Sequence, residues 1–301
     1  MNDTEWNLLH CGLPAYYSHI VALFDASKVH SYVIDFARLA LQFASPITNA
    51  KPINGQPKNQ RSEEIRTDLL SRLFSTSLYT ARYDLANSTL GLMRDEALKS
   101  NYLRTLIITM AESQSVSSML SLPWLGLEDA VSAVLSQKSQ SVVDVNAGVP
   151  WHMILYSWRI RRGDFRGAAS VAYERLQKLQ VLAEKEGGAP ARAPAGKMVL
   201  RNGQYEWDER RGRDELDSEV TRAYLQVINA LACVDGEQAW IFVEPVVGPK
   251  KGPLAGEKRR VVRIEELRKA LSEEIEREED LRRGRFAFGG GEVRDDAIMS
   301  G

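Results

Sequence analysis

The chain has 301 residues, of which 44% are hydrophobic and 26% charged, a balance typical of a folded globular protein with a sizeable core. Its 39 Lys and Arg residues are matched by 40 Asp and Glu, so the overall charge favours neither nucleic acid nor an anionic membrane as a partner. Two cysteines, Cys11 and Cys233, are too few for a disulfide framework or a Cys-rich metal site. No secretory signal stands at the start and no apolar run approaches the ~18 residues of a membrane span, so we expect a soluble, intracellular protein.

Helical periodicity dominates the chain. Apolar residues recur at helical spacing in 28–43 (KVHSYVIDFARLALQF), 62–80 (SEEIRTDLLSRLFSTSLYT), 95–113 (DEALKSNYLRTLIITMAES), 126–139 (GLEDAVSAVLSQKS) and 214–234 (DELDSEVTRAYLQVINALACV). Ser62 is the expected N-cap of the second of these helices. Strand-like alternation is almost absent, so the sequence predicts an all-α protein of about ten helices.

Residues 151–176 (WHMILYSWRIRRGDFRGAASVAYERL) predict an antiparallel pair of helices. Gly163 is expected to end the first helix and Asp164 to cap the second. A DNA-reading helix-turn-helix is the alternative, since five arginines lie nearby. The alanine-rich second helix offers few side chains for base edges, however, so the arginines are expected to cap and line the packed pair.

Three stretches rich in Pro, Gly and polar residues, 45–61, 187–213 and 244–260, are expected to be exposed loops, and 286–301 a disordered tail. Within the second stretch, Asn202-Gly203 predicts a small hairpin. The basic residues of 249–263 (PKKGPLAGEKRRVVR) suit nuclear import, although solvated loops of this kind are common without that role. Helices of the same character continue on both sides of each loop, so we predict one domain over 1–285. The helix pairs follow no fixed period, which indicates an irregular solenoid rather than a regular repeat array.

Motifs for catalysis are missing. The sequence has no phosphate-binding or dinucleotide-binding glycine loop, no H-E-x-x-H and no G-x-S-x-G. The four histidines, His10, His19, His30 and His152, are scattered, and His152 falls beside an apolar stripe rather than opposite a carboxylate that the sequence places. We therefore expect no enzyme, no cofactor and no metal. An enzyme with a histidine-bound metal between helices stays open as a minor alternative.

Four segments in a fixed order resemble a known family: YYSHIVALFDASKVHSYVIDFARLALQFA (16–44), RYDLANSTLGLMRDEALKSNYLRTLIITMAE (82–112), ILYSWRIRRGDFRGAASVAYERL (154–176) and AYLQVINALACVDGEQAWIFVEP (223–245). Together they resemble the solenoid of the large Y-complex nucleoporin, called one-sixty in animals and one-twenty in fungi. The resemblance runs from about Tyr16 to about Leu271, and EQAWIFVEP and RIEELRKA are its most distinctive parts. The long insertion at 187–213 departs from the pattern.

This resemblance implies a structural subunit of the Y-shaped coat complex that builds the outer rings of the nuclear pore, located at the nuclear envelope. Family members carry an N-terminal β-propeller before the solenoid. Because this chain has no propeller-like run of strands, it would be a C-terminal fragment. The implied partners are two other solenoid nucleoporins, one-forty-five C (ninety-six in animals) and eighty-five, in a hetero-oligomer without direct contact to nucleic acid.

The end of the predicted stack is the expected partner surface, because the last helix pair has no next neighbour to cover it. The residues expected there are Trp240, Phe242, Ile264, Leu267, Leu271 and Ile275, the last four forming a stripe about as narrow as a coiled-coil contact line. Replacing Leu267 and Leu271 with charged residues would then weaken assembly while leaving helicity intact. The alternative function is a solenoid adaptor of a vesicle-coat or trafficking complex that binds peptides or cargo.

Overall fold

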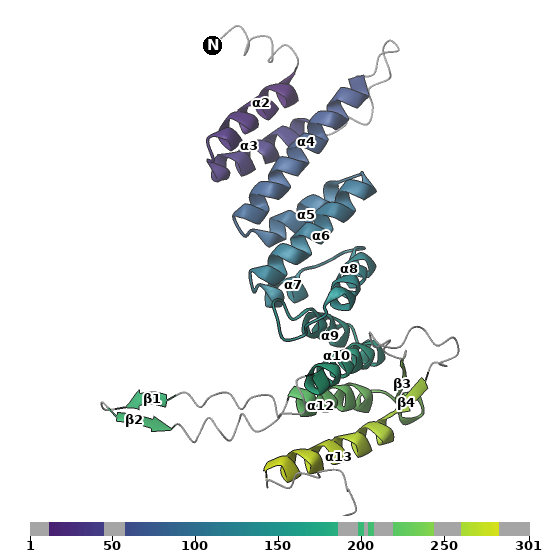
Figure 1. Cartoon of the computed structure of the whole chain (residues 1–301). Coiled ribbons are helices and arrows are strands. Elements are labelled where there is room, and N and C mark those ends of the chain that lie inside the picture. Colours follow the sequence, from purple (N-terminus) through teal and green to yellow (C-terminus); the bar gives the residue numbers. More distant parts are fainter. Residues whose placement is uncertain are drawn as a thin grey trace, which may run out of the picture. The chain divides into compact units, whose positions relative to one another are not determined.

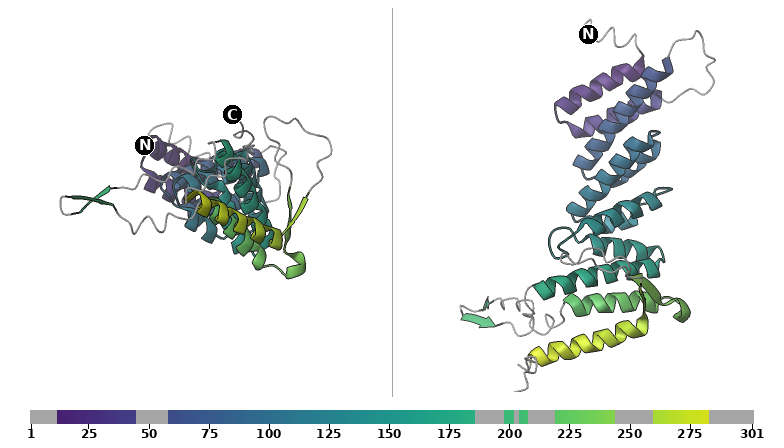
Figure 2. Two further views of the ribbon diagram at one scale, coloured as in Figure 1. Left: turned by 60° about the horizontal axis from the view of Figure 1, so that its bottom comes forward. Right: turned by 45° about the vertical axis from the view of Figure 1, so that its right-hand side comes forward.

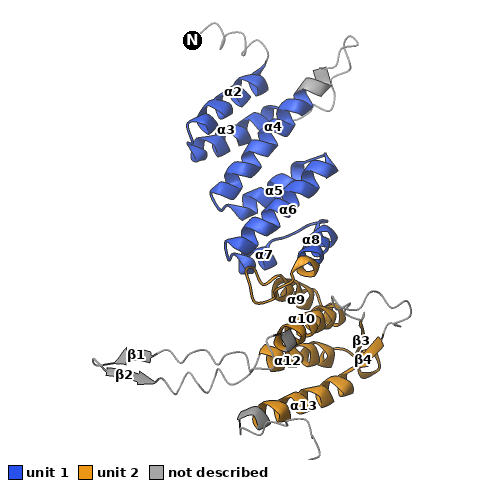
Figure 3. Ribbon diagram, in the orientation of Figure 1, with its two compact units in different colours: residues 1–138 blue, residues 139–301 orange. Residues whose placement is uncertain are grey.

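The computed structural model describes residues 12–44, 58–185, 198–201, 204–207, 219–243 and 260–282. They form eleven α-helices, one 3-10 helix and two two-stranded sheets, which confirms the predicted all-α class (Figure 1). The chain divides into two compact units, residues 1–138 (unit 1) and 139–301 (unit 2), coloured separately in Figure 3. The single domain expected over 1–285 stays a prediction. The tail 286–301 lies outside the described residues, as do His10, Cys11 and most of the three predicted loops.

Unit 1 is a stack of helices in chain order. Its elements are α2 (Leu13–Ala26), α3 (His30–Phe43), α4 (Lys58–Tyr79), α5 (Tyr83–Leu92), α6 (Glu96–Glu112), α7 (Val116–Ser121) and most of α8 (Glu128–Ser141). Helix α3 packs against α2 and α4, and α5 packs against α4 and α6 (Figure 2, right). One core cluster joins α2, α3 and α4, through Val21, Val33, Ile34, Ala37, Ala40, Leu69 and Leu73. Packing between chain neighbours is the defining property of a helical solenoid.

The start of α4 differs from the prediction. The helix begins at Lys58, so Ser62 lies one turn inside it instead of capping it. The physical reason is that Lys58 to Arg61 contains no helix breaker, so the helix extends beyond the Ser-Glu-Glu signal that suggested a cap.

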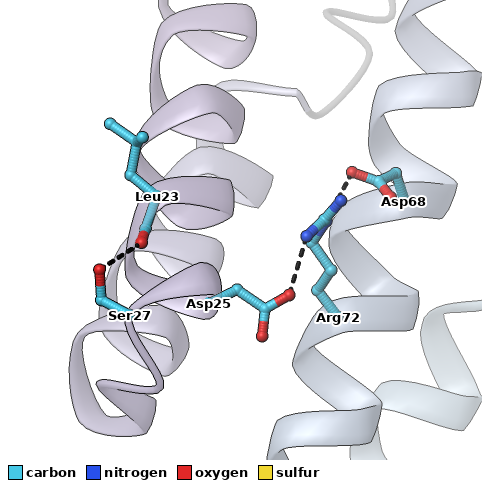
Figure 4. Close-up of polar contacts among 5 residues, drawn as sticks. All are labelled: Leu23, Asp25, Ser27, Asp68 and Arg72. Carbon is cyan, nitrogen blue, oxygen red and sulfur yellow. Dashed lines mark hydrogen bonds and ion pairs between the residues drawn. The ribbon is translucent and has the colours of Figure 1, made fainter.

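A polar bridge also connects α2 to α4 (Figure 4). The guanidinium of Arg72 donates from Nη1 to Asp25 Oδ2 at 2.8 Å and from Nε to Asp68 Oδ2 at 2.9 Å. The hydrogen bond that Arg72 donates to Asp68, opposed by desolvation and helped by the charges of Asp68 and Asp25, raises the pKa of Arg72. Because all three side chains are about a third to a half exposed, this bridge orients the helices and contributes little free energy.

Four helix ends in the two units share one backbone motif. In each, a residue with positive φ follows the helix, and the next N–H donates to the carbonyl five residues before it, as Asp164 does to Arg159 at 3.0 Å. The left-handed residues are Lys28, Ala81, Gln114 and Gly163, with φ of 56°, 54°, 58° and 75°. The predicted stop at Gly163 is confirmed, and so is the predicted cap, because Asp164 Oδ1 accepts from Gly167 N at 2.8 Å.

This motif predicts opposite effects at two equivalent positions. Gly163→Ala should lower the free energy of unfolding by about 1 kcal/mol, because a side chain is strained at this φ. Ala81→Gly should raise the free energy of unfolding, by up to about 1 kcal/mol, because it relieves the same strain. Urea denaturation followed by circular dichroism measures both changes. Equal signs for the two variants would contradict this account of the helix ends.

Unit 2 contains the end of α8, followed by α9 (Trp151–Arg161), α10 (Phe165–Lys185), β1 (Met198–Arg201), β2 (Gln204–Trp207), α12 (Glu219–Ala232), η1 (Gly236–Gln238), β3 (Trp240–Val243), β4 (Arg260–Arg263) and α13 (Ile264–Arg282). Helix α10 packs on α9 and α12, and α13 covers the other side of α12 (Figure 2). The antiparallel pair expected at 151–176 is therefore present as α9 and α10. One core cluster runs through α10, α12, α13 and the β3–β4 sheet.

Both sheets are antiparallel pairs of four-residue strands. In β1–β2, Arg201 lies opposite Gln204, so the predicted hairpin around Asn202-Gly203 is confirmed. The β3–β4 pair was not predicted, and it joins Ile241 to Val262 across residues 244–259. Four residues are too few for a period-2 pattern to stand out, and the two strands are distant in sequence.

Candidate interaction surface

The structure divides the six predicted partner residues between the interior and the surface. Ile264 and Leu267 are 8% and 2% exposed and belong to the core of unit 2, so they have no free surface for a partner. Leu271 is half-buried against the same core, whereas Ile275 is 41% exposed. Trp240 is half-buried and Phe242 is 57% exposed.

The apolar stripe of α13 does not run straight along the helix. Its first three members face the core, but further along two glutamates take the inner positions. Glu278 Oε1 accepts a hydrogen bond from Thr221 Oγ1 of α12 at 3.0 Å, and only 14% of the Glu274 side chain is exposed. Ile275 lies to one side of this inner face. The expected coiled-coil-like contact line is therefore mostly an internal helix contact.

The β3–β4 sheet has an inner and an outer face. Ile241, Val243 and Val262 are buried, and side chains alternate along each strand. The outer face is formed by the residues between them in each strand. Across the two strands, Trp240 lies opposite Arg263 and Phe242 lies opposite Val261. Phe242 and Val261 are 57% and 41% exposed, so the outer face is open and partly apolar.

Arg166 from the first turn of α10 fixes one end of this face. Its Cζ lies 3.4 Å from the centroid of the Trp240 ring, and its Nε donates to the Trp240 carbonyl at 3.1 Å. The Trp240 ring meets Phe242 edge to face, with centroids 4.7 Å apart. Cation–π and edge-to-face contacts hold these side chains in defined positions before any partner arrives. We call Arg166, Trp240, Phe242, Val261 and Arg263 the β3–β4 patch.

Sequence reasoning missed Arg166 and Val261 as members of the surface. The neighbouring arginines behave as predicted, lining the helix pair: Arg159 donates to the Gly167 carbonyl at 2.7 Å, and Arg162 lies over the Trp158 ring at 4.3 Å. Arg166 instead reaches Trp240, 74 positions along the chain. No local sequence signal reports that contact.

A buried polar cluster joins α8, α9 and α10 within unit 2. His152, only 3% exposed, places Nε2 3.6 Å from Glu174 Oε1 and 3.2 Å from Lys178 Nζ. Lys178 also lies 3.0 Å from Glu174 and donates to the carbonyls of Ser139 and Val142, at the C-terminal end of α8. Contrary to the sequence analysis, His152 does face a carboxylate, because Glu174 comes from the next helix.

The cluster strongly perturbs one carboxyl group. Interaction with His152, whose Nε2 lies 3.6 Å from the carboxylate, is the largest cause, and Lys178 adds a hydrogen bond and its charge, so the pKa of Glu174 falls to about 2 although burial opposes the shift. The lysine donates to two carbonyls at the end of α8, where the last carbonyls of a helix have no partner within the helix itself. The arrangement ties the end of α8, α9 and α10 together.

Other kinds of site are not found among the described residues. No group of three or more His, Cys, Asp or Glu is arranged to hold a metal ion there, and His30 rests against the Tyr79 ring. Within the same residues, no helix is long and apolar enough to cross a bilayer. An open depression of about 440 Å³ in unit 1 is lined by Arg38, Arg82, Asp84, Leu85 and Ser88. The β3–β4 patch is therefore the best-defined candidate for binding.

Comparison with known proteins identifies the family. A family described as Nucleoporin Nup120, HEAT repeats, matches residues 1–112. Nucleoporin NUP120 of Chaetomium thermophilum is 44% identical over 253 residues, which cover 84% of this chain and 18% of that protein. The Nuclear pore complex protein Nup160 homolog of Drosophila melanogaster is 23% identical over 60% of this chain and 11% of its own length. Nucleoporin nup120 of Schizosaccharomyces pombe is 22% identical over 57% of this chain and 14% of its own length.

The chain thus spans less than a fifth of the length of these curated relatives. The name of the Drosophila relative assigns that protein to the nuclear pore complex and the other two are named nucleoporins, which confirms the location expected from the resemblance. The stacked helices of unit 1, which contains the matched residues, agree with a HEAT-repeat match. The chain belongs to the Nup120/Nup160 family of nucleoporins.

Proposed function

We propose that this chain is a non-enzymatic part of the nuclear pore scaffold that binds other helical nucleoporins and so helps to assemble the Y-shaped coat complex of the outer rings. The observation that carries the proposal is the 44% identity to nucleoporin NUP120 over 84% of the chain. Stacked helices support it, because a solenoid offers long surfaces for partners. The partners proposed are the solenoid nucleoporins one-forty-five C (ninety-six in animals) and eighty-five.

We place one contact at the β3–β4 patch, with Ile275 of α13 as a second exposed apolar residue of the same unit. Binding hot spots are enriched in tryptophan and arginine, and Trp240 and Arg166 are already held in fixed positions. A stable interface buries about 800 Å² on each partner, more than these side chains alone supply. The patch is therefore proposed as the centre of a larger contact.

The test is reconstitution of the complex. The purified chain is mixed with each proposed nucleoporin, and the mass of the product is measured by light scattering. A stoichiometric complex is expected, and Phe242→Ala should weaken it about tenfold or more, as loss of a hot-spot side chain does. Phe43→Ala is the matched control, since this phenylalanine of unit 1 is also exposed.

Two results would argue against the proposal. If neither nucleoporin forms a stoichiometric complex with the chain, the scaffold function fails. If the chain instead binds only short peptides, and releases them quickly, the adaptor function of a trafficking complex takes its place.

A further inference from the structure

We propose that the β3–β4 patch receives a short acidic segment of a partner protein, with a large apolar side chain of that segment resting on Phe242 and Val261. This inference rests on the proposed scaffold function and specifies the chemistry of the partner. It follows from the exposed apolar residues of the patch, from two arginines beside them that form no ion pair among the described residues, and from the positive charge of residues 244–259, which connect the two strands in the sequence.

The apolar part of the patch is a ready contact for one large side chain. Phe242 and Val261 lie opposite each other in the register and are both exposed. The Trp240 ring stands edge-on beside Phe242, and Arg166 covers Trp240. Because these contacts exist within the chain itself, a partner would not have to order them on binding.

The charged part of the patch is positive. Among the described residues no ion pair is formed by Arg263 or by Arg166, whereas Arg260 is neutralised by Glu266 at 2.8 Å. The four residues that the two strands place on this face include no carboxylate. Arg166 Nε donates to the Trp240 carbonyl, and its terminal N–H groups have no acceptor among the residues that the structure describes. Guanidinium groups bind carboxylates with two parallel hydrogen bonds.

Three other occupants fit this face less well. The chain's own segment 244–259 has four basic and two acidic residues, so its charge has the same sign as the two arginines. Nucleic acid and anionic membranes need several cations in a row, while this face offers two and the whole chain has a net charge of −1. An acidic protein segment matches both the arginines and the aromatic surface.

Fluorescence anisotropy with labelled synthetic peptides tests the inference on the full chain. The probe is a short peptide of Glu and Asp that carries one Leu and one Phe. One reference peptide has Gln and Asn in place of the acids, and another has Ala in place of Leu and Phe. The acidic apolar peptide should bind at least about tenfold more tightly than either reference, and added salt should weaken it.

Variants locate the binding. Phe242→Ala and Arg263→Gln should each weaken the acidic apolar peptide about tenfold, whereas Arg268→Gln, a change of an exposed arginine on α13, should leave binding unchanged. Thermal melts establish that each variant is folded. Equal binding of the amide peptide, unchanged binding by both patch variants, or tighter binding of a single-stranded oligonucleotide or of phosphatidylserine vesicles would overturn the inference.

The two proposals can fail separately. If the nucleoporin complex forms and neither patch variant affects it or the peptide, the acidic-segment inference fails and the scaffold function stands. If the peptide binds as expected and no nucleoporin complex forms, the scaffold function fails and the chemistry of the patch stands.

Discussion

Replacing Leu267 with alanine is expected to lower the free energy of unfolding of unit 2 by about 2–4 kcal/mol. Leu267 is 2% exposed and belongs to the core cluster between α13 and α12. Removing three buried carbon atoms loses their transfer free energy and leaves a cavity where α13 packs against α12. Ile275→Ala on the same helix is the matched control, with an expected cost below about 1 kcal/mol, because Ile275 is 41% exposed.

Urea denaturation of both variants, followed by circular dichroism, measures this difference. Equal destabilisation by the two changes would show that α13 does not pack as described.

The packing of α13 also revises the test of assembly that the sequence suggested. Glutamate at Leu267 would place a charge in the core, so it would disrupt folding before any effect on a partner could be measured. Ile275→Glu is the change on α13 that tests binding while leaving the helix folded.

Replacing Glu174 with glutamine is expected to lower the free energy of unfolding by about 1–2 kcal/mol at neutral pH, and by much less near pH 2. The folded-state pKa of Glu174 is about 2, below the ordinary value of 4.5. A carboxyl group whose pKa is lowered in the folded state stabilises the fold at pH values above its unfolded-state pKa. This contribution is lost as the pH falls from about 4.5 to about 2. The magnitude is set below the full linkage value because 35% of the side chain is exposed to solvent.

The measurement compares the parent chain with Glu174→Gln by urea denaturation at about pH 7 and at about pH 3. The difference in free energy should shrink at the lower pH, because at about pH 3 the Glu174 carboxyl of the unfolded chain is protonated, whereas that of the folded chain stays largely ionised beside His152 and Lys178. Glu276→Gln is the control, since this glutamate is exposed on α13 and should show almost no difference at either pH. An equal cost of Glu174→Gln at both values would mean that the ionised carboxylate contributes nothing to stability.

The sequence by itself determined the local structure and the family. Helical spacing of apolar residues is a property of neighbours three and four apart, so α3, α6, α9 and α10 follow from it directly. Gly163 and Asp164 mark a helix end and a helix start through their own conformational and hydrogen-bonding preferences. Asn202-Gly203 marks the β1–β2 hairpin in the same way. The order of the helical segments was enough to indicate the nucleoporin family.

Only the tertiary structure decided which side chains face inward and which stay available for binding. Two four-residue strands pair across residues 244–259, and that pairing creates the open face with Phe242 and Val261. Arg166 joins the face from 74 positions away, and Glu174 reaches His152 from the next helix. On α13, the contact with α12 decides that Leu267 is buried and Ile275 exposed, although both belong to one apolar stripe. Each result depends on contacts between elements that are distant in the chain, and periodicity within one element carries no information about such contacts.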